Sequence, residues 1–139
     1  MDASNVAEDL FWLIVQCKKN VNEIPQICSK GENGVLIYLS FVKNEVSSSE
    51  LSNKLNVSLP RIANVLNVLE NKNLITKKVD KDDKRKTIVA ITDEGKKVVL
   101  QKKEETIIGL TNILEKMTEE ERNDYLRLTK KFIEIIQKL

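Results

Sequence analysis

Histidine is absent from this chain of 139 residues, and cysteine, proline, glycine and aromatic residues are all scarce. Without histidine the chain lacks the commonest general base, the commonest metal ligand and every histidine-activated nucleophile. Its two cysteines, Cys17 and Cys28, lie too far from any other cysteine to indicate a disulfide framework or a zinc site. We therefore expect no enzyme activity, no bound metal and no cofactor.

Long apolar runs are also missing. No stretch of about 18 uncharged apolar residues occurs, and the first residues lack the basic-then-apolar pattern of a signal peptide, so we expect a cytoplasmic protein without membrane contact. Four glycines and two prolines leave little room for linkers. The length fits one domain, or one domain with a dimerisation extension, and the low aromatic content of 4% favours an aliphatic, helical core.

The net charge of +2 is unevenly distributed. Residues 47–91 hold nine Lys and Arg against five Asp and Glu, a net charge of +4. The segment before them has a net charge of −2, and the segment after them is neutral. A cationic middle third is expected if that third faces a polyanion such as nucleic acid.

Helices are predicted over residues 4–19, 34–43, 93–117 and 119–138. The evidence is apolar residues at spacings of three and four, except over 34–43, where a nearly continuous apolar run indicates a short buried helix. Two shorter helices precede the third of these. The first is capped by Ser47 or Ser48, with Glu50 at the capping-box spacing. The second is capped by Ser58, tolerates Pro60 in its first turn and runs to about Asn71. Two short helices separated by about three residues are typical of a helix-turn-helix.

Two β-rich runs follow, over residues 74–79 and 87–91, and seven consecutive charged residues join them. They predict a two-stranded hairpin, which is marginal alone. We expect it to pack on the preceding helices through apolar residues of both strands: Leu74, Ile75, Ile88 and Ala90 or their neighbours. Thr92 and Thr118 are expected to cap the last two helices, Thr118 in a capping box with Glu121. The predicted fold is mainly α with a small β-hairpin wing (α+β), a winged helix-turn-helix between terminal helices.

Four segments make this prediction more specific: ELSNKLNVS, LENKNLI, DKDDKR and ITDEGKK. With Asp83 and Arg85 as an Asp-x-Arg signature at the wing tip, residues 47–99 resemble the DNA-binding core of the MarR family of bacterial regulators. Where relatives have glycine this chain has Asn73, the next-best residue for a left-handed turn. The resemblance implies a winged helix-turn-helix lobe over residues 31–95 and a helical dimerisation region over 1–30 and 96–139.

The resemblance also implies a function. The chain is expected to be a sequence-specific transcriptional regulator, a repressor that binds a pseudo-palindromic operator in double-stranded DNA as a homodimer. A small aromatic or lipophilic effector is expected to release it. The competing hypothesis is a winged-helix protein-interaction module that acts as a co-regulator without specific DNA binding. Steep salt dependence would distinguish the two, since only DNA binding releases many counterions.

Three groups of residues are expected at the DNA. The recognition helix contributes Ser58, Leu59, Pro60, Arg61, Asn64 and Asn67; the wing contributes Asp83, Lys84, Arg85 and Lys86; Ser48, Ser49, Lys54 and Lys77 contact the DNA backbone. Arg85 suits a narrow minor groove, and a bidentate pair with Asp83 would hold it in place. Asn64 can pair two-fold with adenine, whereas many relatives have arginine there. Alternatively, the wing charges only solubilise a hairpin, and the asparagines form an exposed polar face.

A dimer would read two half-sites, one with each helix-turn-helix. Apolar residues of the terminal helices are the interface candidates, although some can pack in the monomer's own core: Leu10, Ile14, Phe132, Ile136 and Leu139. Four aromatic residues either line an effector pocket or belong to the core: Phe11, Trp12, Tyr38 and Phe41. Cys17 lies near the end of the first helix, whereas peroxide-sensing relatives carry their reactive cysteine near its start. Oxidant sensing by Cys17 or Cys28 stays an open alternative.

Overall fold

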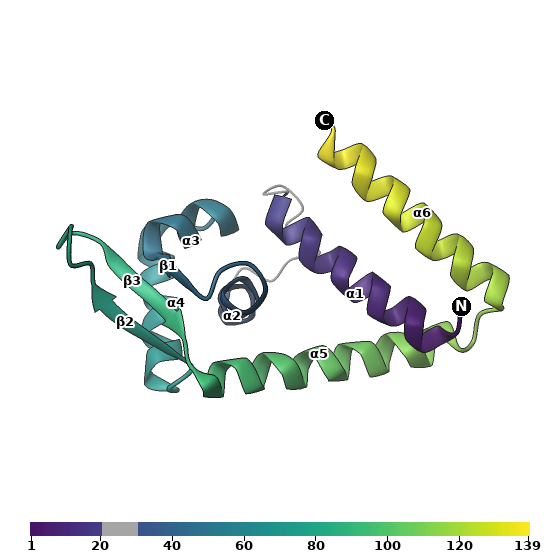
Figure 1. The fold of residues 1–139 in the computed structure, drawn as a ribbon, viewed down its shortest axis with the longest axis horizontal. Helices are drawn as coiled ribbons and strands as arrows, with labels where there is room; N and C mark the ends of the chain where they lie inside the picture. Colours follow the sequence, from purple (N-terminus) through teal and green to yellow (C-terminus); the bar gives the residue numbers. More distant parts are fainter. Residues whose placement is uncertain (21–30) are drawn as a thin grey trace. The chain divides into compact units, whose positions relative to one another are not determined.

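The computed structural model describes residues 1–20 and 31–139, which form two compact units. The helical unit contains residues 1–20 and Gln101–Leu139, and the winged unit contains residues 31–100. Helix α5 (Asp93–Leu114) begins in the winged unit and ends in the helical unit (Figure 1). The break predicted over residues 22–34 lies mostly outside the described residues.

The winged unit combines helices with short strands (Figure 1). Its elements are α2 (Glu32–Phe41), β1 (Glu45–Ser47), α3 (Ser48–Leu55), α4 (Leu59–Asn71), β2 (Ile75–Val79), β3 (Thr87–Ile91) and the start of α5. Helices α3 and α4 form the predicted helix-turn-helix, and β2 and β3 form the wing. The predicted fold class, mainly α with a β wing, is confirmed.

The wing is part of a three-stranded antiparallel sheet, not the two-stranded hairpin that the sequence predicted. The strand order is β1-β3-β2, so that β3 is the central strand. Strand β1 pairs Glu45 with Ala90 and Ser47 with Ile88. Since β1 has only three residues and runs directly into the capping serine of α3, it shows no alternating pattern that would reveal a strand.

The sheet packs on the helices through one of its faces. Ile75, Val89 and Val46 are buried, with Val46 directly opposite Val89. On β3 it is the neighbour Val89 that is buried, whereas Ile88 and Ala90 are only half-buried, because the side chains of a strand alternate between its faces. The helices supply the rest of this core, in particular Leu39, Leu51, Ile62, Leu66 and Leu69.

A serine caps the first helix of the helix-turn-helix. Ser47 Oγ accepts a hydrogen bond from the backbone N–H of Glu50 at 3.1 Å. The Glu50 carboxylate does not complete the predicted capping box. It accepts instead from Tyr38 Oη at 2.8 Å and from Lys43 Nζ at 3.1 Å, and so ties α3 to the end of α2.

The second helix also starts and stops as predicted. Ser58 Oγ accepts from the N–H of Arg61 at 3.4 Å, and Pro60 lies in the first turn of α4. After α4, Asn73 has a φ of 62°, which confirms the expected left-handed turn. Asn56, between α3 and α4, has a φ of 54°. Asparagine tolerates this conformation better than other residues with a side chain, which explains its use at both turns.

The start of α5 is held tightly against the end of β3. Thr92 Oγ1 accepts from the N–H of Gly95 at 3.0 Å and donates to the carbonyl of Asn73 at 2.8 Å. A Cβ at Gly95 would lie 2.3 Å from the carbonyl oxygen of Leu74 and 2.7 Å from Ile91 Cγ1. Glycine is therefore required here for close packing. Val98 and Val99 follow in the core of the winged unit, which thus extends beyond residue 95.

The helical unit consists of α1 (Ala3–Asn20), the second part of α5 and α6 (Glu119–Gln137). Its core contains Ala3, Val6, Ala7, Leu10, Leu114 and Leu126. Helix α5 ends at Leu114, three residues before the predicted end, and Met117 still packs on this core. Within the described ranges, no helix is both long and apolar enough to cross a membrane.

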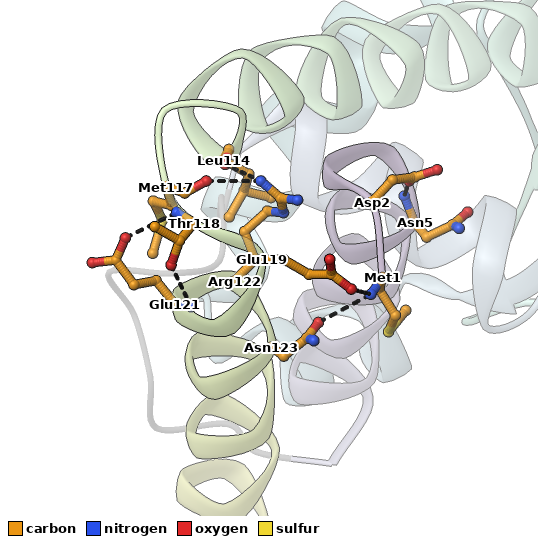
Figure 2. Close-up of polar contacts among 10 residues, drawn as sticks. All are labelled: Met1, Asp2, Asn5, Leu114, Met117, Thr118, Glu119, Glu121, Arg122 and Asn123. Carbon is orange, nitrogen blue, oxygen red and sulfur yellow. Dashed lines mark hydrogen bonds and ion pairs between the residues drawn. The ribbon is translucent and has the colours of Figure 1, made fainter.

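Polar contacts fix the turn between α5 and α6 (Figure 2). Arg122 Nη1 donates to the carbonyls of Leu114 at 3.2 Å and Met117 at 2.8 Å, which satisfies acceptors at the end of α5. The amino group of Met1 donates to Glu119 Oε1 at 3.2 Å and to Asn123 Oδ1 at 3.4 Å. The first residue of the chain thereby contacts the start of α6.

The capping box at α6 is complete and gives a stability prediction (Figure 2). Thr118 Oγ1 accepts from the N–H of Glu121 at 3.1 Å, and Glu121 Oε1 accepts from the N–H of Thr118 at 2.9 Å. We expect Thr118→Ala to lower the free energy of unfolding by about 1 kcal/mol, because the helix loses an N-cap acceptor. Urea titration at a fixed protein concentration measures this change in the free energy of unfolding.

The matched control is Thr106→Ala, in the interior of α5. Thr106 Oγ1 donates back to the carbonyl of Lys102 at 2.9 Å, and alanine has the higher helix propensity, so stability should stay unchanged or rise slightly. Equal losses in both variants would show that the Thr118 cap has no special role.

Candidate nucleic-acid interface

The acidic residues of the wing tip build its turn. The N–H of Asp80 donates to the carbonyl of Lys86, and the N–H of Lys86 donates to the carbonyl of Asp83, both at 3.0 Å. Asp80 Oδ1 in turn accepts from the N–H of Asp82 at 3.0 Å. These bonds close the hairpin between β2 and β3. The cations interspersed among the acids, Lys81, Lys84, Arg85 and Lys86, are all exposed.

Asp83 holds the base of the Arg85 side chain. One carboxylate oxygen, Oδ1, accepts from the backbone N–H of Arg85 at 3.0 Å and from its Nε at 3.2 Å. The predicted bidentate pair is thus corrected: one oxygen bonds Nε and the backbone, and the contact leaves out both terminal nitrogens of the guanidinium. The backbone bond, and then the side-chain bond, lower the pKa of Asp83, which keeps it ionised. The Arg85 side chain is 92% exposed.

The predicted recognition residues lie on the exposed part of α4 and its cap. All six are exposed: Ser58, Leu59, Pro60, Arg61, Asn64 and Asn67. The opposite side of the helix carries the buried residues Ile62, Leu66 and Leu69. Leu59 is about half exposed, at the first position of the helix.

A groove of about 210 Å³ on the winged unit brings together several of the residues predicted to contact DNA. Its lining comes from α3, α4 and the wing: Ser48, Leu59, Ala63, Leu66, Asn67, Lys77 and Thr87. Inside it, Lys77 Nζ on β2 donates to Asn67 Oδ1 on α4 and lies 3.6 Å from Glu70 Oε1. The sequence gave no reason to select Glu70, because this ion pair joins elements that only the tertiary fold brings together.

The remaining predicted backbone contacts belong to α3. Ser48 begins the helix and is half-buried, whereas Ser49 and Lys54 are exposed. On β2, Lys78 forms an ion pair with Glu45 of β1 at 3.3 Å. The winged unit therefore presents cations and hydroxyls from α3, α4 and the wing, an arrangement that suits a phosphate backbone.

The family is decided by sequence comparison. Residues 10–102, most of the chain, match the family described as transcriptional regulator SarA/Rot. The chain belongs to the SarA/Rot family. This family comprises transcriptional regulators, which agrees with the expectation that the chain is not an enzyme.

One curated relative is also described as a transcriptional regulator. The chain is 29% identical over 87 residues to an uncharacterised HTH-type transcriptional regulator, YdgJ, of Bacillus subtilis. The match covers 63% of this SarA/Rot-family chain and 53% of YdgJ, so it spans about half the length of that relative.

Solved structures share the fold. Streptococcus pneumoniae FabT in complex with DNA has a TM-score of 0.63 and 21% identity, over 77% of this chain and 74% of that chain. The crystal structure of MarR has a TM-score of 0.61 and 22% identity, over 76% and 71%. The predicted MarR-type winged-helix fold is thus confirmed, and the SarA/Rot match confirms the predicted transcriptional regulator.

Two of the four aromatic residues proposed for an effector pocket lie in the helical unit of this SarA/Rot-family protein. Phe11 and Trp12 pack edge to face, with ring centroids 5.5 Å apart. Lys103 Nζ lies 5.5 Å from the centroid of Phe11 and 4.6 Å from that of Trp12. The Glu8 carboxylate accepts a hydrogen bond from Trp12 Nε1 at 3.0 Å and forms an ion pair with Lys103 at 3.1 Å. The hydrogen bond from Trp12, and then the contact with Lys103, lower the pKa of Glu8.

The other two aromatic residues lie in the winged unit. Tyr38 is buried and donates to Glu50; its burial, and then that hydrogen bond, raises the pKa of Tyr38 to about 12, so that the phenol stays neutral. Phe41 packs against the core of the same unit. Both residues thus have core roles within their unit, and the common effector pocket stays a prediction.

The predicted interface residues have different surroundings. Leu10 is only 5% exposed and packs in the core of the helical unit, so we remove it from the interface. Phe132 and Leu139 are exposed, and Ile136 is half-buried. The side chain of Ile14 lies outside the described part of the chain. The same holds for the side chain of Cys17 and for Cys28, so oxidant sensing stays an open alternative.

Proposed function

We propose that this protein represses transcription by binding a pseudo-palindromic operator as a homodimer. Helix α4 enters the major groove, and the wing reaches the flanking minor groove. The observation that carries the proposal is the wing tip, where Asp83 fixes the base of an arginine whose side chain is almost fully exposed. Fixing the base reduces the rotamer entropy that insertion into a narrow groove would cost. The shared fold with FabT, solved on DNA, supports the same proposal.

On α4, the exposed polar residues are suited to base edges. Arg61 can bond the two acceptors of guanine or a phosphate, and Asn64 can pair two-fold with adenine. Both lie in the N-terminal half of the helix, which is the part that docks in helix-turn-helix proteins. An operator half-site containing adenine is therefore expected.

The homodimer proposal rests on an uncovered apolar face of α6. Its members are Tyr125, Leu128, Phe132, Ile135 and Leu139, which are all more than half exposed. They alternate at spacings of three and four, which is the seam of a coiled coil. A second copy of the chain, packed through this seam, would bury the face that the monomer leaves in water.

In this proposal a small aromatic or lipophilic effector releases the operator. Trp12 is the best placed of the four aromatic candidates, because its side chain is 40% exposed while Phe11 and Tyr38 are buried. An effector that displaces Lys103 from the two rings would act on the helical unit. Its aromatic character fits the rings that it would contact.

Salt dependence tests the operator-binding function. Full-length protein is used to select binding sites from a random-sequence pool, and fluorescence anisotropy then follows binding to the selected duplex at several salt concentrations. The association constant should fall as salt is added. A plot of its logarithm against the logarithm of the salt concentration should have a slope of about −4 or steeper, because the protein contacts several phosphates. Excess scrambled duplex should not compete. Failure to enrich any sequence, with salt-insensitive binding to protein partners, would favour the co-regulator hypothesis instead.

A further inference from the structure

Asn67 and Lys77 are joined within the proposed DNA-binding face. Lys77 Nζ donates to Asn67 Oδ1 and forms an ion pair with Glu70 Oε1 at 3.6 Å. The Lys77 side chain is only 25% exposed, whereas Asn67 is exposed on α4. Packing and two polar partners therefore hold the ammonium against the asparagine.

This contact decides which group Asn67 presents. An ammonium has hydrogen-bond donors and no acceptor, so it must bind the amide oxygen rather than the amide nitrogen. With Oδ1 bound to Lys77, Asn67 offers the two N–H donors of Nδ2 to a base in the major groove of DNA. An asparagine that pairs with adenine needs its oxygen to accept from the adenine amino group. Lys77 occupies one of the two acceptor sites of that oxygen and therefore competes with adenine for it.

We propose that Asn67 distinguishes keto bases from amino bases on the strand that it faces, and that Lys77 is the positioning residue for this choice. Guanine O6 and thymine O4 accept hydrogen bonds in the major groove, whereas adenine N6 and cytosine N4 donate them. A side chain whose two N–H donors are free while its oxygen is held by an ammonium favours guanine or thymine. The inference rests on the proposed operator binding, and it gives Lys77 a role other than a phosphate contact.

The experiment compares the operators that full-length variants select from a random-sequence pool. Wild type should enrich a motif with guanine or thymine at one position of each half-site. Asn67→Asp offers acceptors only, so that position should change to adenine or cytosine, by a factor of about ten. Lys77→Met frees the amide oxygen, and the same position should then accept adenine.

Matched controls carry the same charge changes on the same elements. Asn71→Asp alters the exposed last residue of α4, and Lys78→Met removes the lysine that pairs with Glu45. Both should select the wild-type motif. The four variants alter half-buried or exposed polar side chains, and circular dichroism checks their folding.

The outcomes separate the inference from the function on which it rests. If wild type enriches no motif, the operator-binding proposal fails. If wild type enriches a motif that neither Asn67→Asp nor Lys77→Met changes, operator binding stands and the inference is overturned. Weaker binding by Asn67→Asp with no altered base preference would assign Asn67 to the DNA backbone, which also overturns the inference.

Discussion

Phe132→Glu is expected to make the protein monomeric and to lower its affinity for the operator at least about 100-fold. Phe132 is the central member of the exposed seam on α6, between Leu128 and Ile135, and is 62% exposed in the single chain. In a two-fold dimer, a carboxylate there would face apolar side chains and approach its own copy, which costs both desolvation and repulsion. A monomer reads one half-site and loses the gain from linking two binding events.

Sedimentation equilibrium and anisotropy on the selected duplex measure the two effects. The control is Gln137→Glu, the same charge change at the exposed last residue of α6. It should leave the dimer and the affinity nearly unchanged. Circular dichroism should show a folded Phe132→Glu variant, because the helical unit keeps its own core around Leu114 and Leu126. A stable dimer with normal affinity would contradict the α6 interface.

The same helix shows how far a sequence pattern can specify packing. The spacing of apolar residues predicted α6 and its cap correctly, because both depend on local interactions. It did not reveal that Leu126, rather than Leu128, is the buried leucine. Leu126 lies beside the apolar stripe that contains Leu128 and Phe132, and only its contact with α1 and the end of α5 identifies it as core. The same contact explains why Leu10 is a core residue and not an interface residue.

Strand β1 is a second case in which local pattern was insufficient. Three residues cannot display alternation, and the sheet forms there because β3 supplies unpaired backbone groups at its edge. The wing-tip residues were predictable, since turn chemistry and the Asp-x-Arg spacing are local. The Asn67–Lys77–Glu70 contact was not, because it needs α4 and β2 side by side.

Arg85→Ala is expected to weaken binding to the selected operator by about 1–3 kcal/mol. The proposed contact is insertion into the minor groove, where narrow segments concentrate negative potential and favour a guanidinium. Because Asp83 bonds Nε and the backbone, the terminal nitrogens can reach the groove without breaking the turn. Asp83→Ala should weaken binding less than Arg85→Ala, since it removes the orientation of the arginine but keeps the charge.

Lys81→Ala removes one positive charge from the same turn and serves as the control. It should weaken binding to operator and to scrambled duplex by similar factors, because a phosphate contact is independent of sequence. Arg85→Ala should lower affinity for the operator more than for the scrambled duplex, since groove width depends on sequence. Anisotropy on both duplexes at one salt concentration measures the ratio. If Arg85→Ala changed neither the operator affinity nor the ratio of operator to scrambled affinity, Arg85 would have no part in the interface.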